Sequence, residues 1–463
     1  MKLEERKLAE LVQEVLTRLS KTQTSVPAGI GIFASMEEAI EAAFLAQKEL
    51  MALSLQERNQ IIQAMREASI ASAEYISKLA VEESKMGRME DKIQKNILAA
   101  TKTPGTEDLR TEALSGDGGL TVVEMGPYGV IGAITPTTNP SETIINNGIG
   151  MIAAGNSVVF SPHPTAKNTS LETIRILNEA IVKAGGPKNL LTSVVEPTIE
   201  KAEIMMKHKK IKLLVATGGP GVVKAVLSSG KKAIGAGAGN PPVVVDETAD
   251  IPKAAQDIIA GCSFDNNLPC IAEKEVFVVE KVAEQLIQCM QKNGAYLLSD
   301  PKKLVELEKL LLDGRAPNKD FIGRDAQVIL RAIGLEVCPE IRVVIAIVEK
   351  DHSFVINELM MPVLPIVKVR NVWEAIDYAV EVEHGFRHTA IMHSKNVDHL
   401  TAFARAIDTT IFVKNAPSFA GIGVGGEGHT TFTIAGPTGE GVTSARSFTR
   451  QRRCVLSGGL YIL

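Results

Sequence analysis

Aromatic side chains are scarce in this sequence. They make up 4% of its 463 residues, whereas glycine occurs 38 times. A core of aliphatic side chains with many glycine-containing loops is typical of an α/β protein. Because the chain is longer than one ordinary hydrophobic core can organise, we expect two or more lobes, with room for the enclosed cleft that an enzyme needs.

Strong charge of one sign and long apolar runs are also absent. The net charge is −4 and basic residues are interspersed with acidic ones, so nucleic acid is not an expected partner. No apolar run approaches the roughly 20 residues of a membrane-spanning helix. The chain begins with MKLEERKLAE, which is charged rather than apolar. We therefore expect a cytoplasmic protein without a membrane partner.

The cysteines are few and scattered. They contain no CxxC pair, and no histidine cluster has metal-ligand spacing, so we expect neither a disulfide framework nor a metal site. The compartment is expected to be reducing. The five cysteines are Cys262, Cys270, Cys289, Cys338 and Cys454.

Periodic patterns divide the chain into a helical part and two α/β parts. Residues 35–100 carry Ala, Leu and Glu at helical spacing. Short β-branched runs then alternate with helical segments, first from TVVEMGPYGVIGAITP to IKLLVA and again from PPVVVD to TTIFVKN. This alternation predicts parallel sheets with crossover helices. The strand-like tail RQRRCVLSGGLYIL is suited to pairing with another subunit.

The N-terminal segment has the pattern of a separate helix. Within residues 1–19 one apolar stripe predicts an amphipathic helix, and residues 20–29 predict a flexible linker because they are polar and lack a period. Two interpretations remain open: a helix that folds back onto its own domain, and a detachable helix that docks into a groove on a partner.

Two segments at the ends of predicted strands offer binding chemistry. TGGPG, residues 217–221, joins a strand to a helix, where backbone N–H groups and the helix dipole can meet a phosphate. A glycine turn with a purely geometric role is the alternative. In ITPTTNP, Asn139 offers an amide donor for a developing oxyanion, or it caps the helix that begins near Ser141.

The stretch FDNNLPCIAEK contains the cysteine that differs from the others. Cys270 follows Pro269, which has no backbone donor, in a polar loop within an otherwise apolar region. No histidine lies nearby in sequence to act as its base. From these residues alone, a reactive nucleophile and a buried, inert cysteine both remain open.

The motifs together resemble a known family. FDNNLPCIAEK, GAGAGNPPVVVDETAD, NELMMPVLPIVKV and GIGVGGEGHTTFTIAGPTGEG are similar, in order, to the CoA-acylating branch of the aldehyde dehydrogenase superfamily that serves bacterial microcompartments. The resemblance covers residues 25–463. It implies a Rossmann-like nucleotide-binding domain (30–236, with an arm strand near 118–127), an α/β catalytic domain (237–430), and a C-terminal β oligomerisation arm (431–463).

On this resemblance, Cys270 is the nucleophile, and its backbone N–H and an amide such as that of Asn139 hold the oxyanion of the thiohemiacetal. Hydride passes to NAD+, and coenzyme A then releases the acyl group. Hydrolytic members have a glutamate that activates water, but the matching position is Ala236, and no acidic residue lies between Gly230 and Val245. A thiolate needs less activation than water, so acyl-CoA is the expected product.

Other sites are implied by the same resemblance. Ser161 stands where the family usually has an adenosine-contacting lysine, and His163 is either its substitute or a loop residue stacked against Pro162 and Pro164. Thr138 is an alternative to Asn139, and His429 is either a substrate-side residue or a structural loop residue. The implied cofactor-binding residues are Thr135, Pro136, Thr137, Ser161, His163, Thr217, Gly218, Gly219, Gly221, Ala236, Gly237, Glu358 and Pro362; the substrate-side candidates are Thr138, Ile271 and His429.

The resemblance also implies partners. The substrate is a short-chain aldehyde, with propionaldehyde favoured and acetaldehyde as the alternative. The arm implies a homodimer or homotetramer, and residues 1–19 imply docking with microcompartment shell or cargo proteins. Two further hypotheses remain: a phosphate-dependent reductase on the same fold, and an inactive scaffold homologue.

Overall fold

The structure, a computed structural model, describes residues 30–314 and 316–462. The expected helix at 1–19 and linker at 20–29 lie outside the described residues. The α-helices are α2 (Met36–Leu50), α3 (Leu55–Ser84), α4 (Met89–Lys102), α5 (Pro140–Ala153), α6 (Lys167–Lys183), α7 (Ile199–Lys207), α8 (Pro220–Leu227), α9 (Ile251–Ser263), α10 (Glu280–Lys292), α11 (Pro301–Leu311), α12 (Ala326–Ala332), α13 (Ser353–Ile356), α14 (Val372–Val382) and α15 (Val397–Ile407). The 3-10 helices are η1 (Thr106–Asp108), η2 (Pro164–Ala166), η3 (Phe264–Asn267), η4 (Ser418–Ile422) and η5 (Ala445–Phe448).

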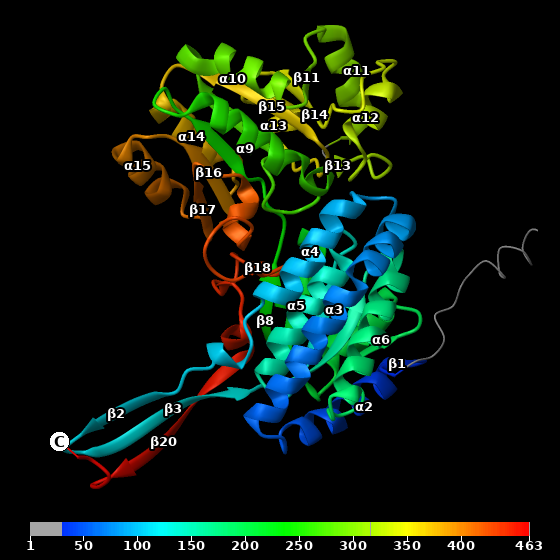
Figure 1. Cartoon of the computed structure of the whole chain (residues 1–463), viewed down its shortest axis with the longest axis vertical. Coiled ribbons are helices and arrows are strands. Elements are labelled where there is room, and N and C mark those ends of the chain that lie inside the picture. Colours follow the sequence, from blue (N-terminus) through cyan, green and yellow to red (C-terminus); the bar gives the residue numbers. More distant parts are fainter. Residues whose placement is uncertain (1–29, 315, 463) are drawn as a thin grey trace, which may run out of the picture.

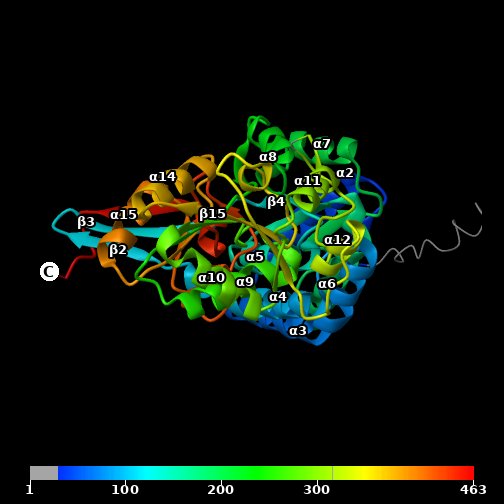
Figure 2. The same ribbon diagram turned by 90° about the horizontal axis from the view of Figure 1, so that it is seen from above.

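The first lobe contains a parallel sheet covered by helices (Figure 1). Helices α2 and α3 each begin with a serine capping box, at Ser35 and Ser54, and α3 packs against α4, α5 and α6 (Figure 2). The predicted helical layer over residues 35–100 is therefore confirmed. In sheet order the strands are β1 (Ile32–Phe33), β6 (Leu191–Val194), β5 (Ser157–Pro162), β4 (Val130–Thr135), β7 (Ile211–Thr217) and β8 (Lys232–Ala236).

The second lobe contains another parallel sheet, and β8 is followed directly by its first strand in sequence. Its central strands are buried along their whole length, which explains their uninterrupted Val and Phe runs. In sheet order the strands are β11 (Ala295–Leu297), β14 (Val343–Ile347), β15 (Val363–Val369), β10 (Glu275–Val279), β9 (Pro242–Val245), β16 (Thr389–His393) and β17 (Ile411–Lys414). The alternating α/β fold that the sequence predicts is confirmed.

An antiparallel arm projects beyond both lobes (Figures 1 and 2). The arm consists of β2 (Glu112–Gly116), β3 (Gly119–Pro127) and β20 (Thr449–Ser457). The tail pairs with its own chain, with Arg453 opposite Val123, and the outer edge of β20 has no strand partner among the described residues. Two hairpins complete the strands, β12 (Leu312–Asp313) with β13 (Ala316–Pro317) and β18 (Ile434–Ala435) with β19 (Gly441–Val442).

One predicted strand is two strands in the structure. The run TVVEMGPYGVIGAITP divides into β3 of the arm and β4 of the first sheet. The division falls at Gly129, whose φ of 118° no ordinary side chain adopts easily. Asn156 Oδ1 accepts hydrogen bonds from the N–H groups of Tyr128 and Gly129 and fixes this turn.

Two further features are absent from the described part of the chain. None of its helices has the length and low charge that crossing a bilayer requires. In the same residues, no three or more His, Cys, Asp or Glu side chains group in a way that would hold a metal ion.

Candidate active site

The site lies where the two sheets approach each other. The carboxyl ends of β4, β5, β7 and β8 carry Thr135, Pro162, Thr217 and Ala236. One lysine, Lys95 of α4, contacts both the residue that precedes α5 and the loop before β10. Open parallel sheets bind ligands outside the carboxyl ends of their strands, so the first sheet offers a nucleotide site here.

The amino ends of neighbouring strands of the second sheet bring distant segments together. Strands β15, β10, β9 and β16 are adjacent and parallel. Glu358 precedes β15, Cys270 precedes β10, Gly239 precedes β9 and His388 precedes β16. Parallel topology therefore gathers a thiol, a carboxylate and an imidazole at one edge of the sheet.

Backbone geometry before the cysteine is unusual. Asp265, Asn266 and Asn267 have φ values of 47°, 54° and 67°, in the left-handed region that Asp and Asn tolerate better than most residues. All three are buried. Asn267 Nδ2 donates to the carbonyl oxygens of Cys262 (3.1 Å) and Glu273 (2.9 Å). The polar run that the sequence singled out thus shapes the loop that carries Cys270.

The Cys270 thiol is held in its protonated form. Burial, together with the charge of Glu358, raises its pKa to about 12 against the opposing effect of Lys274. The hydrogen bond from the Cys270 backbone N–H lowers the pKa but does not outweigh burial. Reaction at neutral pH therefore requires a group that accepts the thiol proton.

His388 is the residue that sequence reasoning missed. A Cβ added at Gly239 would lie 2.8 Å from the Cys270 carbonyl oxygen and 2.9 Å from His388 Cγ, so the imidazole is close to the Cys270 backbone. Burial, with help from Lys274, lowers the pKa of His388 to about 4. Nδ1 contacts Thr389 Oγ1 at 2.9 Å, whereas Nε2 has no partner among the described residues. A neutral imidazole with a free nitrogen can accept a proton.

Glu358 is near enough to Cys270 for its charge to raise the pKa of the thiol. Its Oε1 is 3.9 Å from Lys274 Nζ, and burial raises its pKa. Lys274 is itself fixed, because Nζ donates to Asn267 O (2.9 Å) and Asn267 Oδ1 (2.7 Å). The same cation therefore supports the cysteine loop and faces the carboxylate.

Asn139 does not cap α5 through its side chain. It occupies the N-cap position, but its side chain makes no capping hydrogen bond there. Instead Oδ1 accepts from Lys95 Nζ at 2.6 Å, and Nδ2 lies 3.2 Å from Thr138 Oγ1. Of the two interpretations of Asn139, the helix cap is wrong.

A cleft of about 510 Å³ lies along the carboxyl ends of the first sheet. A Cβ added at Gly218, Gly219 or Gly221 would meet nothing within 4 Å, so these backbones are open to a ligand. The α8 N-terminus that they precede has no side-chain cap at Gly219. An open glycine turn at a helix N-terminus fits a pyrophosphate. The predicted residues that line this cleft are Thr135, Pro136, Ser161, His163, Thr217, Gly218, Gly219 and Gly221.

The remaining predicted residues lie elsewhere. Thr137 contacts Thr165 beside the cleft, and Gly237 lines a smaller cavity of about 270 Å³. Ala236 pairs with Thr217, Pro362 directly precedes β15, and the side chain of Ile271 is buried in the core of the second lobe. His429 lines a separate cavity of about 710 Å³ with Arg66 and Lys102.

Comparison with known proteins identifies relatives along the whole chain. The pattern of the aldehyde dehydrogenase family matches residues 25–302. The propanal dehydrogenase (CoA-propanoylating) of Salmonella typhimurium is 51% identical over 453 residues, which cover 98% of this chain and 97% of that protein. The acetaldehyde dehydrogenase (acetylating) EutE of Escherichia coli is 49% identical, with 97% of each chain covered.

A solved structure is similar over nearly the same extent. The propionaldehyde dehydrogenase of Rhodopseudomonas palustris, with bound CoA and an acylated cysteine, is 56% identical and superposes with a TM-score of 0.91 over 92% of this chain and 98% of that chain.

Proposed function

The chain belongs to the aldehyde dehydrogenase family, and from that membership we propose that it converts a short-chain aldehyde and coenzyme A into an acyl-CoA while reducing NAD+. Propionaldehyde is the favoured substrate because two relatives named CoA-propanoylating propanal dehydrogenases are 51% and 50% identical, each over 98% of the chain. Cys270 carries the acyl group between the two half-reactions.

The observation that carries the proposal is that a Cβ at Gly239 would meet both the Cys270 carbonyl oxygen, at 2.8 Å, and His388 Cγ, at 2.9 Å. Because His388 is neutral and its Nε2 has no partner among the described residues, it can accept the thiol proton as the sulfur attacks the aldehyde. At position 236, where hydrolytic members place their glutamate, this chain has alanine. The acyl enzyme is therefore better suited to attack by a thiol than by water.

In the first half-reaction, Cys270, His388 and Asn139 each have a separate role. Cys270 gives its thiol proton to His388, and its sulfur bonds to the aldehyde carbon, whose oxygen becomes an oxyanion. The Asn139 amide donates to that oxyanion and stabilises its charge. A bound NAD+ would supply the hydride acceptor, and loss of hydride from the same carbon would leave a thioester on Cys270.

Release reverses the role of the cysteine. His388, after losing the first proton to solvent, accepts the proton of the CoA thiol. The CoA sulfur attacks the thioester carbonyl, Asn139 again stabilises the oxyanion, and the Cys270 sulfur leaves as a thiolate. The proton on His388 then returns to the Cys270 thiolate, so each turnover consumes one aldehyde, one NAD+ and one CoA and forms one acyl-CoA, one NADH and one proton in solvent.

The 510 Å³ cleft is the proposed nucleotide site. Thr217, Gly218 and Gly219 would hold a pyrophosphate at the N-terminus of α8, and His163 would lie beside the adenosine. Glu358, whose Oε1 lies 3.9 Å from Lys274 Nζ, would hold the nicotinamide ribose. Thr138, next to Asn139, belongs to the aldehyde side of this proposal, whereas His429 lines the separate cavity of about 710 Å³ and is not part of it.

The assembly is also proposed. We assign residues 30–236 to nucleotide binding, 237–430 to catalysis, and 431–463 with residues 118–127 to an arm that joins subunits in a homodimer or homotetramer. A relative 55% identical to this chain is a propionaldehyde dehydrogenase of the Clostridium phytofermentans fucose utilisation microcompartment. On this basis residues 1–19 would dock with shell or cargo proteins of such a compartment.

Acetaldehyde is the second candidate substrate, because the acetylating relative at 49% identity is nearly as similar. The two aldehydes differ by one methylene, which a hydrophobic pocket distinguishes by about 1 to 3 kcal/mol. The ratio of kcat/KM for propionaldehyde and acetaldehyde decides between them.

The test is steady-state NADH formation from acetaldehyde, propionaldehyde and butyraldehyde, each with CoA, with phosphate, and with neither. We expect turnover only with CoA. Cys270→Ala should abolish it, whereas Cys289→Ala, at a half-buried cysteine packed against the core of the second lobe, should retain it. Turnover with phosphate but not with CoA would indicate a phosphate-dependent reductase instead. A wild-type enzyme with no turnover under any of these conditions would indicate an inactive scaffold.

A further inference from the structure

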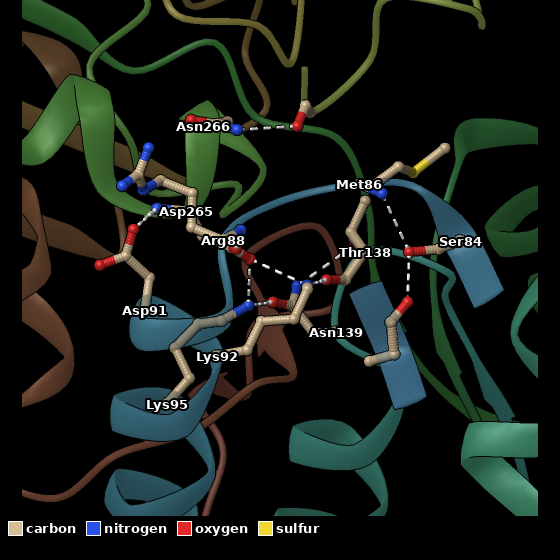
Figure 3. A network of polar contacts seen from close by, with 12 residues as sticks. Ser84, Met86, Arg88, Asp91, Lys92, Lys95, Thr138, Asn139, Asp265 and Asn266 are labelled. Atoms are coloured by element: carbon tan, nitrogen blue, oxygen red, sulfur yellow. Dashed lines mark hydrogen bonds and ion pairs between the residues drawn. The ribbon is translucent and has the colours of Figure 1, made fainter. Parts of the chain in front are cut away.

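Two buried lysines of α4 lie between the Cys270 loop and the first turn of α5 (Figure 3). Lys92 Nζ lies 3.0 Å from Asp265 Oδ2 and 3.1 Å from the Thr138 carbonyl oxygen. Lys95 Nζ lies 2.6 Å from the same Asp265 oxygen and 2.6 Å from Asn139 Oδ1. Its third neighbour is Glu142 Oε1, at 3.0 Å. Lys95 thus donates hydrogen bonds to Asp265 and Asn139, and Glu142 adds an ion pair without a hydrogen bond to Oε1.

This arrangement determines which way the Asn139 amide faces. An ammonium group donates hydrogen bonds and cannot accept them, so the amide oxygen must face Lys95. The NH2 group must then face away from it, towards Thr138 Oγ1 at 3.2 Å. That contact engages one of its two protons, and the described residues provide no other acceptor for Nδ2. The second proton is therefore available to an oxyanion.

Charge balance alone does not account for the position of Lys95. The two lysines and the carboxylates of Asp265 and Glu142 already form a neutral set. The contact with Asn139 adds nothing to that balance because an amide is uncharged. Both lysine side chains are almost fully buried, at 1% and 0% exposed, yet only Lys95 contacts the amide.

Asp265 connects this cluster to the nucleophile. It begins the left-handed run that leads to Cys270, and its Oδ1 accepts a hydrogen bond from the Arg88 N–H at 2.8 Å. A Cβ at Gly87 would lie 2.1 Å from the same oxygen, so α4 and the cysteine loop are in close contact there. One ammonium group therefore joins the amide donor to the loop that carries the thiol.

We propose that Lys95 is a positioning residue that, held by Asp265 and Glu142, fixes the Asn139 amide with its NH2 group presented to the oxyanion on the Cys270 adduct. This rests on the proposed function, in which Asn139 stabilises that oxyanion. Lys95 itself touches neither the aldehyde nor a cofactor. It acts on both tetrahedral intermediates, because both form on the same sulfur.

The test is a double-mutant cycle on the NADH burst. The full-length enzyme is mixed with propionaldehyde and NAD+ without CoA, and the burst rate constant reports acylation alone. Asn139→Ala should slow the burst about 100-fold or more, as loss of an oxyanion donor does. Lys95→Met should slow it about tenfold or more, since the amide is then free to rotate. Lys95→Met combined with Asn139→Ala should be no slower than Asn139→Ala alone.

Lys92→Met is the matched control. It removes an equally buried ammonium group from the same helix and the same carboxylate, but leaves the Lys95 contact with Asn139 intact. We expect both methionine variants to lower the thermal unfolding midpoint and to bind NADH with the same affinity. The burst should be slowed at least tenfold more by Lys95→Met than by Lys92→Met. If Lys95→Met does not fold, the double variant Lys95→Met with Glu142→Gln, which removes one charge of each sign, replaces it in the cycle. Its burst rate constant is then compared with that of Glu142→Gln alone.

The outcomes are distinct. Equal slowing by Lys92→Met and Lys95→Met, or slowing by Lys95→Met that multiplies with that of Asn139→Ala, would overturn the positioning role and leave the proposed function standing. A normal burst in Asn139→Ala would overturn the oxyanion role of Asn139 and the positioning role with it. A normal burst in Lys95→Met would overturn the positioning role directly.

Discussion

Gly239→Ala should disturb the active site without straining the backbone. The backbone of Gly239 has no positive φ, so alanine can adopt its conformation, and the only conflict is one of space. The added Cβ would stand 2.8 Å from the Cys270 carbonyl oxygen and 2.9 Å from His388 Cγ. Because one neighbour is backbone and the other a buried ring, neither can move aside freely.

The size of the effect follows from these distances. An ordinary contact begins at 3.4 Å, so the Cys270 backbone must retreat by 3.4 − 2.8 = 0.6 Å. Overpacking of this kind costs about 1 to 3 kcal/mol of unfolding free energy. Since a misplacement of about 1 Å can cost roughly 100-fold in rate, the 0.6 Å shift should slow acylation about tenfold.

The assay combines chemical denaturation with the NADH burst. Gly237→Ala is the control for stability, because a Cβ there meets nothing within 4 Å, and its unfolding free energy should equal that of the wild type. A Gly239→Ala enzyme with wild-type stability and burst rate would show that Cys270 and His388 are not packed together as described, and the proton transfer between them would lose its basis.

Two further predictions concern the buried histidines. His388→Ala should lower kcat at saturating CoA by about 100-fold or more, as loss of a general base does, and an unchanged kcat would exclude it as the base. Burial lowers the pKa of His393 from 6.5 to about 3, so its contribution to stability is present above pH 6.5 and is lost as the pH falls towards 3. The difference in unfolding free energy between wild type and His393→Leu should therefore shrink from pH 7 to pH 4, and a difference independent of pH would contradict a buried neutral imidazole.

Much of the fold is predictable from local patterns. The Val-rich runs and the helical spacing between them predict two parallel sheets, because each strand and each crossover helix is one continuous segment with a recognisable periodicity. The break at Gly129 could not be predicted from the sequence. A single glycine between two β-branched runs is compatible with one continuous strand and with two strands of different sheets.

The site was only partly predictable. Cys270 and Asn139 were recognisable because each lies in a distinctive short motif. His388 was not, because it is 118 residues from Cys270 by number (388 − 270) and meets it only through the order β10, β9, β16 in the sheet. The signal was available in outline: HTAIMH opens with a histidine directly before a strand, and segments that precede adjacent parallel strands meet at one edge.

The cluster around Lys95 was beyond local reasoning for a similar reason. Its contacts join α4 to the start of α5 and to the loop before β10, three segments that are far apart in sequence. A lysine at helical spacing gives no sign that it is buried, and only the packed structure shows that Asp265 and Glu142 compensate its charge.

The central claim is that Cys270 forms an acyl enzyme that waits for a thiol rather than water. It is tested most directly by intact-protein mass spectrometry of the enzyme after reaction with propionaldehyde and NAD+ in the absence of CoA. The account predicts a mass increase of one propionyl group, located on Cys270 and removed within the mixing time when CoA is added. An enzyme that stays unmodified while it releases propionate in repeated turnovers would contradict it.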